Sequence, residues 1–267
     1  MTDLVTIDQL GGIADVRLNR PEKYNALSPD MFKAIVAAAE ELAQAKDLRA
    51  VVLSGSGRGF CAGLDMASFQ GMAEAGDRSA ANALLAADAG PENFAQRPAY
   101  VWKRLPMPVI AAIHGVAYGG GCQIALGADI RFAAPDAKMS IMEIKWGLVP
   151  DMSITQTLRD LLPLDVAKEL AFTGRVLSGL EARELGLVTH VADDPRAAAL
   201  RLAEEIAGKS PSAIRAGKRL FEESWHADAA VGLGLEASLQ AGLIGSPNQI
   251  EAVKANFANR PPKFADE

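Results

Sequence analysis

Hydrophobic and polar residues alternate near the N-terminus, first over residues 4–9 and again over residues 13–18. A period of two is typical of strands with one buried face, and the Gly11-Gly12 pair between the two runs predicts a hairpin turn. From residue 31 to residue 45 the apolar residues follow the spacing of one helix face, which predicts a helix. The N-terminal part therefore reads as a β-hairpin followed by a helix.

Polar caps and prolines predict where helices start. Ser28 precedes Pro29, an order that suits an N-cap followed by the first helical position. Ser178 and Glu181 have the spacing of a capping box, in which each side chain bonds to the backbone amide of the other residue. Pro211 opens another predicted helix.

Short, wholly apolar runs predict buried strands in the first part of the chain, at residues 50–53, 109–113 and 130–133. Residues 138–144 are expected to form one more strand. Strands and helices thus alternate first, and helices accumulate towards the C-terminus. This order indicates an α/β core with a helical C-terminal part.

The remaining predicted helices begin at residue 123 and cover residues 152–161, 227–243 and 249–257. Residues 67–99 are rich in Ala, Gly and Asp and show little periodicity. We expect that stretch to form loose helix and mobile loop.

The composition narrows the class of protein. The 267 residues are 49% hydrophobic and 22% charged, as in ordinary globular proteins, and a net charge of −6 disfavours nucleic-acid binding, which needs a basic face. No apolar run is long enough for a membrane span and the N-terminus lacks a secretory signal, so we expect a cytoplasmic location. Cys61 and Cys122 lie among small residues, where cysteine usually packs, and the three histidines are dispersed, so no metal site is expected.

Two loops of small residues are candidates for chemistry. Residues 59–65 and 114–123 each follow a predicted buried strand and are rich in glycine. Such loops let a ligand approach the backbone and can present amide groups to a negative charge. A tight surface turn and close helix–strand packing are the structural alternatives. Together the two loops suggest an oxyanion hole made of two backbone amides.

Two acidic residues are candidates for proton transfer. Glu143 interrupts an apolar run, so its carboxylate either faces solvent on an edge strand or is buried with a raised pKa. Asp151 follows closely and has an alternative structural role as the N-cap of the predicted helix 152–161.

Four segments, in this order along the chain, resemble the crotonase superfamily of enoyl-CoA hydratases and isomerases: residues 19–27, 60–65, 115–123 and 172–174. The resemblance implies an α/β fold, a crotonase-like spiral of ββα turns with a helical C-terminal trimerisation region. Residues 1–200 would then form the catalytic core that binds acyl-CoA, and residues 201–267 the oligomerisation region. We expect a homotrimer or a dimer of trimers.

The resemblance also implies an acyl-CoA thioester substrate, with coenzyme A as part of the substrate and no other cofactor. The backbone N–H groups of Ala62 and Gly120 match the superfamily's oxyanion hole, which would hold the thioester oxygen as an enolate forms. Lys23 and one of the C-terminal cations, from the same or a neighbouring subunit, are expected to contact the CoA phosphates. The residues expected to bind the substrate are Lys23, Tyr24, Ala26, Ala62, Gly63, Leu64, Asp65, Gly120, Lys254 and Lys263.

One position departs from the hydratase pattern of the superfamily. Those hydratases carry two catalytic glutamates; the second matches Glu143, but the first falls on Gln123, whose amide cannot exchange a proton at neutral pH. The spacing from Glu143 to Asp151 resembles dienoyl-CoA isomerases instead. We therefore expect enoyl- or dienoyl-CoA double-bond isomerisation in fatty-acid degradation, with Glu143 as acid/base and Asp151 as a second acid.

Three alternatives stay open. In the first, the protein is an enoyl-CoA hydratase in which Gln123 only orients water. In the second, it is a non-catalytic acyl-CoA-binding protein, although binding alone requires neither the two amide loops nor Glu143. In the third, it is a thioester hydrolase or dehalogenase, which would need a nucleophilic carboxylate in a different place. In each case residues 67–99 are expected to wall the acyl pocket.

Overall fold

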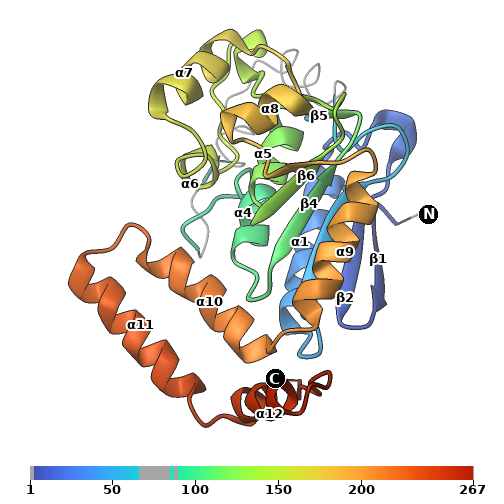
Figure 1. The fold of residues 1–267 in the computed structure, drawn as a ribbon. Coiled ribbons are helices and arrows are strands. Elements are labelled where there is room, and N and C mark those ends of the chain that lie inside the picture. The colour runs from blue at the N-terminus through green and yellow to red at the C-terminus, as the bar shows by residue number, and fades with distance from the viewer. Residues whose placement is uncertain (1–2, 66–84, 87–89, 267) are drawn as a thin grey trace.

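The computed structural model describes residues 3–65, 85–86 and 90–266. A six-stranded sheet lies at its centre, in the strand order β1-β2-β3-β4-β6-β9 (Figure 1). β1 and β2 form the predicted antiparallel hairpin, and every other pair of neighbours is parallel. The strands are β1 (Val5–Leu10), β2 (Ile13–Leu18), β3 (Ala50–Gly55), β4 (Val109–Ile113), β6 (Ile130–Ala133) and β9 (His190–Val191).

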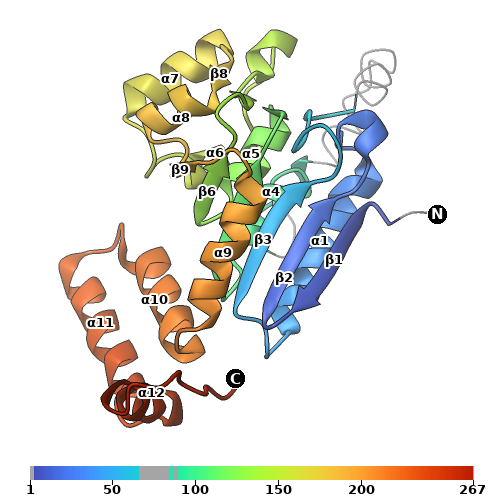
Figure 2. The same ribbon diagram turned by 45° about the vertical axis from the view of Figure 1, so that its right-hand side comes forward.

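Helices cover both faces of this sheet, which confirms the predicted α/β class. α1 (Pro29–Gln44) and α4 (Arg97–Lys103) lie on one face, and α9 (Pro195–Ala207) lies on the other (Figure 2). On β3, Val51 packs in the main core whereas Val52 packs against α9. A strand buried on both faces needs an apolar residue at every position, which is why the parallel strands show no alternation.

A small second sheet, in the order β5-β7-β8, carries the segment after β4. Its strands are β5 (Val116–Tyr118), β7 (Lys138–Ser140) and β8 (Leu177–Ser178). The predicted strand 138–144 is therefore too long, because the chain turns into the 3₁₀ helix η2 (Glu143–Trp146). Gly147 ends this turn at φ +70°, a conformation that favours glycine, and its N–H bonds back to the Ile144 carbonyl at 3.0 Å.

Two predicted helix starts are confirmed by their caps. The Ser28 hydroxyl accepts a hydrogen bond from the Met31 N–H at 3.2 Å, at the start of α1. Ser178 and Glu181 form the complete capping box of α8 (Gly179–Leu185). Both caps depend on residues three positions apart, so the local sequence is enough to define them.

The expected helix 152–161 is wrong in its bounds. The helix here, α6, covers only Ile154–Thr157, because Ser153 adopts φ +66° and breaks the helical path before it. Asp151 is therefore not an N-cap. The helix expected from residue 123 begins earlier, as α5 (Gly120–Leu126).

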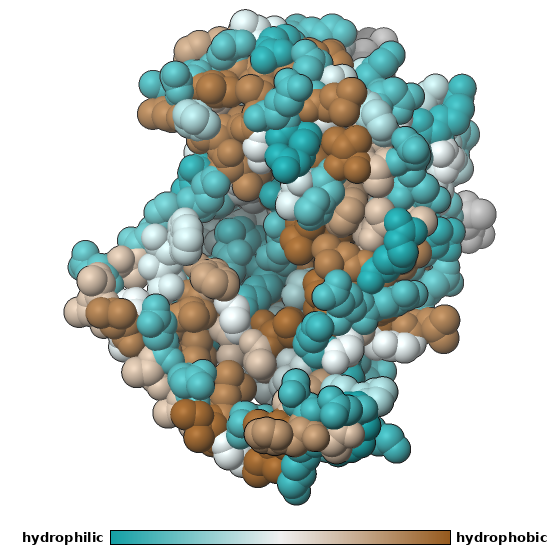
Figure 3. Space-filling view, in the orientation of Figure 1, coloured by the Kyte–Doolittle hydropathy of each residue, from teal (hydrophilic) through white to brown (hydrophobic). Residues whose placement is uncertain are grey.

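Three helices extend away from the sheet and form what we call the C-terminal arm, α10 (Pro211–Ser224), α11 (Ala229–Leu243) and α12 (Pro247–Phe257) (Figures 1 and 2). These helices agree with the predictions. No residue of α11 is buried. Figure 3 shows apolar side chains at the surface of the arm. The large exposed apolar residues in its three helices are Phe221, Trp225, Val231, Leu233, Ile250, Val253 and Phe257.

The expected division near residue 200 falls inside α9, which packs on the sheet; a functional division between core and arm stays a prediction. Most of residues 67–99 lie outside the described residues, and Arg97 to Ala99 belong to α4. The described helices, which also include α7 (Leu164–Thr173) and η1 (Pro21–Lys23), contain none that is long and apolar enough to cross a membrane.

Candidate active site

The two glycine-rich loops lie side by side at the carboxyl edge of the parallel strands. Cys61 and Ala117 form an isolated parallel bridge, with the Cys61 N–H bonded to the Val116 carbonyl at 2.9 Å. A Cβ on Gly121 would lie 2.4 Å from the Cys61 carbonyl oxygen, so only glycine fits at this contact. The close packing that the sequence offered as a structural alternative is present, and the two loops adjoin, as a shared oxyanion hole would require.

Asn25 holds the first loop in place. This buried side chain donates to the carbonyls of Ser56, Gly59 and Phe60, at 2.9 to 3.1 Å, and accepts from the Arg20 N–H at 2.8 Å. The sequence candidates omit Asn25. The residue type itself could have indicated a structural role for Asn25. Asparagine tolerates the left-handed conformation seen here, φ +55°, and bonds readily to backbone groups.

The structure corrects the amide donor expected in the first loop. The N–H of Ala62 donates to the Tyr24 carbonyl at 2.9 Å, so the fold already uses it. The N–H of Leu64, two residues later, has no acceptor among the described residues. Only the tertiary position of Tyr24 decides which amide of this loop is available.

The N–H of Gly120, expected to be the second donor, is unpaired among the described residues. Gly120 is the first residue of α5, so its N–H has no acceptor within the helix, and no other described residue accepts it. A Cβ built on Gly63 would lie 3.7 Å from the Gly120 nitrogen. The two unpaired amides, Leu64 and Gly120, therefore belong to directly adjoining backbone segments.

Glu143 reaches the same place from the start of η2. Its Oε1 accepts a hydrogen bond from Gln123 Nε2 at 2.6 Å. A Cβ on Gly119 would lie 3.2 Å from that Oε1, which places the carboxylate against the glycine run. The other oxygen, Oε2, is buried and has no partner among the described residues. An unpartnered carboxylate oxygen beside two unpaired amides is an arrangement that a ligand would complete.

Burial raises the pKa of Glu143, and the negative charge of Asp151 raises it further, whereas the hydrogen bond from Gln123 lowers it. Of the two interpretations of Glu143, the structure therefore supports burial. Asp151 is exposed as a residue, yet the protein around its carboxyl raises its pKa by desolvation. The two acids are close enough to interact electrostatically.

The other residues expected to bind CoA near the first loop differ in exposure and in bonding. Lys23 is exposed at the end of η1, beside Tyr24, whose ring lies 4.5 Å from the Arg58 guanidinium. The carbonyl of Ala26, a buried residue, accepts from the Arg20 side chain, which also forms an ion pair with Asp65. That ion pair fixes the end of the first loop.

The C-terminal cations lie elsewhere. Lys254 is exposed on α12 and Lys263 follows that helix, at the opposite end of the molecule from α5 (Figure 1). Within one chain the structure does not bring them to Glu143 or to the amide loops.

The two remaining kinds of chemistry to consider are a nucleophilic cysteine and a bound metal. Burial raises the pKa of the thiols of Cys61 and Cys122 to about 12, so both are protonated at neutral pH and neither is an activated nucleophile. Among the residues that the structure describes, no three His, Cys, Asp or Glu side chains are grouped as metal ligands.

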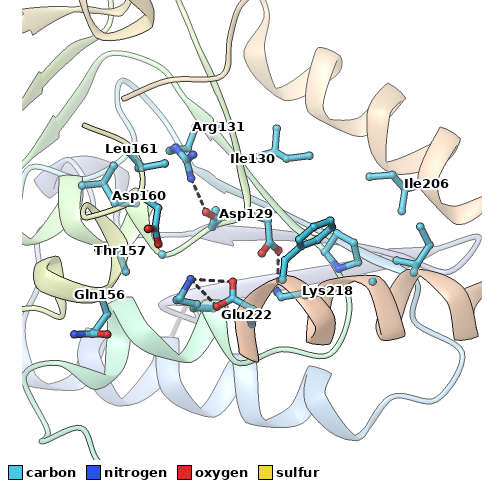
Figure 4. A pocket seen from close by; sticks show the side chains of 18 of the residues that line it. Asp129, Ile130, Arg131, Gln156, Thr157, Asp160, Leu161, Ile206, Lys218 and Glu222 are labelled. Atoms are coloured by element: carbon cyan, nitrogen blue, oxygen red, sulfur yellow. Dashed lines mark hydrogen bonds and ion pairs between the residues drawn. The ribbon is translucent and has the colours of Figure 1, made fainter. Parts of the chain in front are cut away.

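A cavity of about 450 Å³ lies on another side of the molecule, between α10 and the amino ends of β4 and β6 (Figure 4). Two ion pairs form among its lining residues, Lys218 with Asp129 at 2.8 Å and Lys103 with Glu222 at 2.6 Å. None of the candidate catalytic residues lines it. It forms the hollow beside the C-terminal arm in Figure 3.

An α/β core with two adjoining loops whose amides are unpaired, beside a buried carboxylate, is an arrangement able to stabilise a negative charge that develops on a bound substrate. The chain belongs to the enoyl-CoA hydratase/isomerase family, whose sequence profile matches residues 8–267, and so to the crotonase superfamily that the motifs resemble. It is an acyl-CoA enzyme of that family. A structure of enoyl-CoA hydratase from Bacillus anthracis superposes with a TM-score of 0.89 at 30% identity, covering 99% of this chain and 100% of the other, which confirms the fold.

Relatives of similar sequence carry out different reactions. Enoyl-CoA hydratase domain-containing protein 2, mitochondrial, of Mus musculus is 35% identical over 95% of this chain and 84% of its own. Methylglutaconyl-CoA hydratase, mitochondrial, of Homo sapiens is 33% identical over 96% of this chain and 74% of its own length. Delta(3,5)-Delta(2,4)-dienoyl-CoA isomerase, peroxisomal, of Arabidopsis thaliana is 34% identical over 93% of this chain and 91% of its own length. The similarity thus defines the family without choosing a reaction, and the cytoplasmic location stays a prediction.

Proposed function

We propose that this protein moves a carbon–carbon double bond in an enoyl- or dienoyl-CoA thioester. One observation carries the proposal: Glu143 presents a buried, unpartnered carboxylate oxygen, while its hydrogen-bonded neighbour Gln123 is an amide and cannot exchange a proton. Hydration needs one group to take a proton from water and another to deliver a proton to carbon. Relocation of a proton within an enolate needs only one well-placed carboxylate.

The mechanism begins with the thioester oxygen between the N–H groups of Leu64 and Gly120. Glu143 Oε2 removes a proton from C2 of a 3-enoyl-CoA, and the electron pair delocalises onto the thioester oxygen, where the two amides stabilise it. The protonated carboxyl then returns a proton to C4, and the double bond comes to rest between C2 and C3. Atoms and charge balance with no other reactant.

Asp151 extends this chemistry to a conjugated substrate. In a 3,5-dienoyl-CoA the negative charge reaches C6, further from Glu143 than C4 is. The raised pKa of Asp151 keeps more of its carboxyl protonated than an ordinary aspartate, which suits a proton donor. We therefore assign Asp151 the delivery of a proton to C6.

Turnover of three substrates by the purified protein tests the proposal. We expect isomerisation of a 3-enoyl-CoA or a 3,5-dienoyl-CoA and weak hydration of crotonyl-CoA. Asp151→Asn is expected to slow the dienoyl reaction more than the enoyl reaction. Fast hydration of crotonyl-CoA with no isomerisation of either other substrate would establish the hydratase alternative. Binding of acyl-CoA without any turnover would establish a binding protein.

We also propose that the protein forms a homotrimer or a dimer of trimers. The support is the C-terminal arm, where α11 has no buried residue and the apolar side chains of Val231 and Leu233 are about 60% exposed. Burial of this surface against a second copy of the chain would remove it from water. Sedimentation at micromolar concentration is expected to give a trimer or hexamer, and a monomer would contradict the proposal.

A further inference from the structure

Gln123 connects the two acidic segments of the site through one buried side chain. Its Nε2 donates to Glu143 Oε1 at 2.6 Å, and its Oε1 accepts from the Met152 N–H at 2.8 Å. The orientation of the amide follows from these partners, because a backbone N–H must face the oxygen and a carboxylate must face the nitrogen. The side chain is fully buried, so both polar atoms bond to protein.

The contact with Glu143 selects one oxygen for chemistry. Oε1 is held by Gln123, whereas Oε2 is buried and unpartnered. The same hydrogen bond favours the ionised carboxylate and so opposes the rise in pKa that burial causes. Gln123 therefore influences both where the proton is transferred and at what pH Glu143 is ionised.

The contact with Met152 acts on the other acid. Met152 follows Asp151 directly and precedes Ser153, whose φ of +66° makes a sharp turn of the backbone. The Met152 side chain packs on the second loop, since a Cβ on Gly120 would lie 2.6 Å from its sulfur. A hydrogen bond to the Met152 N–H thus anchors the short segment that carries Asp151.

We infer that Gln123 is a positioning residue that sets Glu143 and Asp151 relative to each other, and is not a ligand of the reacting water. The inference rests on the proposed function only in taking Glu143 as the group that transfers the proton. It applies to isomerisation and hydration alike.

Two variants separate the two contacts. Gln123→Met has a similar shape and removes both hydrogen bonds. Gln123→Glu keeps an acceptor for the Met152 N–H but places a second carboxyl oxygen against Glu143, so that the two carboxyls must share a proton. Asn248→Leu is the matched control, because it removes a buried amide of α12 that bonds to the backbone of Ala265 in the segment after that helix.

The pH dependence of kcat/KM is the first readout. In both Gln123 variants we expect the acid limb to move to higher pH, since Glu143 loses a donor that stabilises its charge. We expect Gln123→Met to lower kcat at least 10-fold. Asn248→Leu is expected to lose stability without moving the limb. An unmoved limb in both Gln123 variants would overturn the inference.

The ratio of dienoyl to enoyl turnover is the second readout. Gln123→Met is expected to lower this ratio because the Asp151 segment loses its anchor, whereas Gln123→Glu is expected to keep it. Equal ratios in the two variants would contradict a role for the Met152 contact.

If the protein proves to be a hydratase, the proposed function fails but the pH limb is still measured on crotonyl-CoA. If no substrate turns over, infrared titration of the carboxyl, with Glu143→Gln as the blank, measures the same shift. A loss of hydration alone in Gln123→Met, with an unchanged limb, would make Gln123 a water ligand.

Discussion

Cys61 and Ala117 pair as a parallel bridge that joins the loop after β3 to the segment after β4. The bridge lies beside the two unpaired amides, so the spacing of Leu64 and Gly120 depends on how closely these two backbones approach. Gly121 allows the approach because it has no side chain to meet the Cys61 carbonyl.

Replacing Gly121 by Ala is therefore expected to reduce activity by pushing the loops apart. Alanine favours a helix over glycine by about 1 kcal/mol, so any loss at this helical position comes from the contact and not from helix propensity. Loss of one oxyanion donor typically lowers kcat ~10²–10³-fold, and this is the largest loss of activity that we expect from Gly121→Ala. Steady-state kinetics measures it, with Gly208→Ala as the control, since the nearest atom to a Cβ there is 3.4 Å away. Wild-type activity in Gly121→Ala would show that the loop spacing does not matter.

Exchange of single backbone amides for esters distinguishes Leu64 from Ala62. An ester at Leu64 removes the unpaired N–H, and we expect kcat to fall by roughly 10²-fold or more. An ester at Ala62 removes a bond to Tyr24, and we expect a loss of about 1 kcal/mol in the free energy of unfolding with a much smaller effect on kcat. Kinetics and chemical denaturation of both proteins check this. The reverse pattern would restore Ala62 as the oxyanion donor.

Glu143→Gln is expected to lower turnover at least ~10²-fold, the usual contribution of general acid–base catalysis, with little change in acyl-CoA binding. A base acts only when ionised, so activity of the wild-type protein falls as the pH drops through the pKa of Glu143. Because burial raises that pKa, the acid limb of kcat/KM should lie above the ordinary glutamate pKa of about 4.3. A pH–rate profile measures the limb. A limb at or below that ordinary value would mean that the carboxylate is solvated in the working enzyme.

Lys23→Ala is expected to raise KM for acyl-CoA several-fold with little change in kcat, because an exposed cation near the first loop adds uniform binding. α12, which carries Lys254 and whose Glu251 accepts from the Lys263 N–H, lies far from α5 of its own chain. An effect of Lys254→Ala or Lys263→Ala on KM therefore requires a neighbouring subunit. Measuring all three variants at low and high salt checks this, since screening weakens contacts to phosphate. An unchanged KM in every variant would show that none of these three residues contributes to CoA binding.

The sequence alone determined the features that depend on neighbouring residues. The hairpin, the buried parallel strands and the caps at Ser28 and Ser178 follow from short-range periodicity and from side chains three positions from their partners. The motifs also selected both glycine loops, Gly120 and the pair Glu143 and Asp151 as candidates, because close approach and proton transfer demand particular residue types; their catalytic roles stay predictions.

Only the tertiary structure decided which of these groups are available and how they are held. Whether the Ala62 or the Leu64 amide is unpaired depends on Tyr24, nearly forty residues earlier, and the turn at Glu143 replaces only the end of an expected strand. The role of Gln123 depends on Glu143 and Met152, which lie 20 and 29 residues later in the chain. A hydrogen bond between distant segments leaves no periodic pattern, because the residues that share it are brought together by the packing of the whole core.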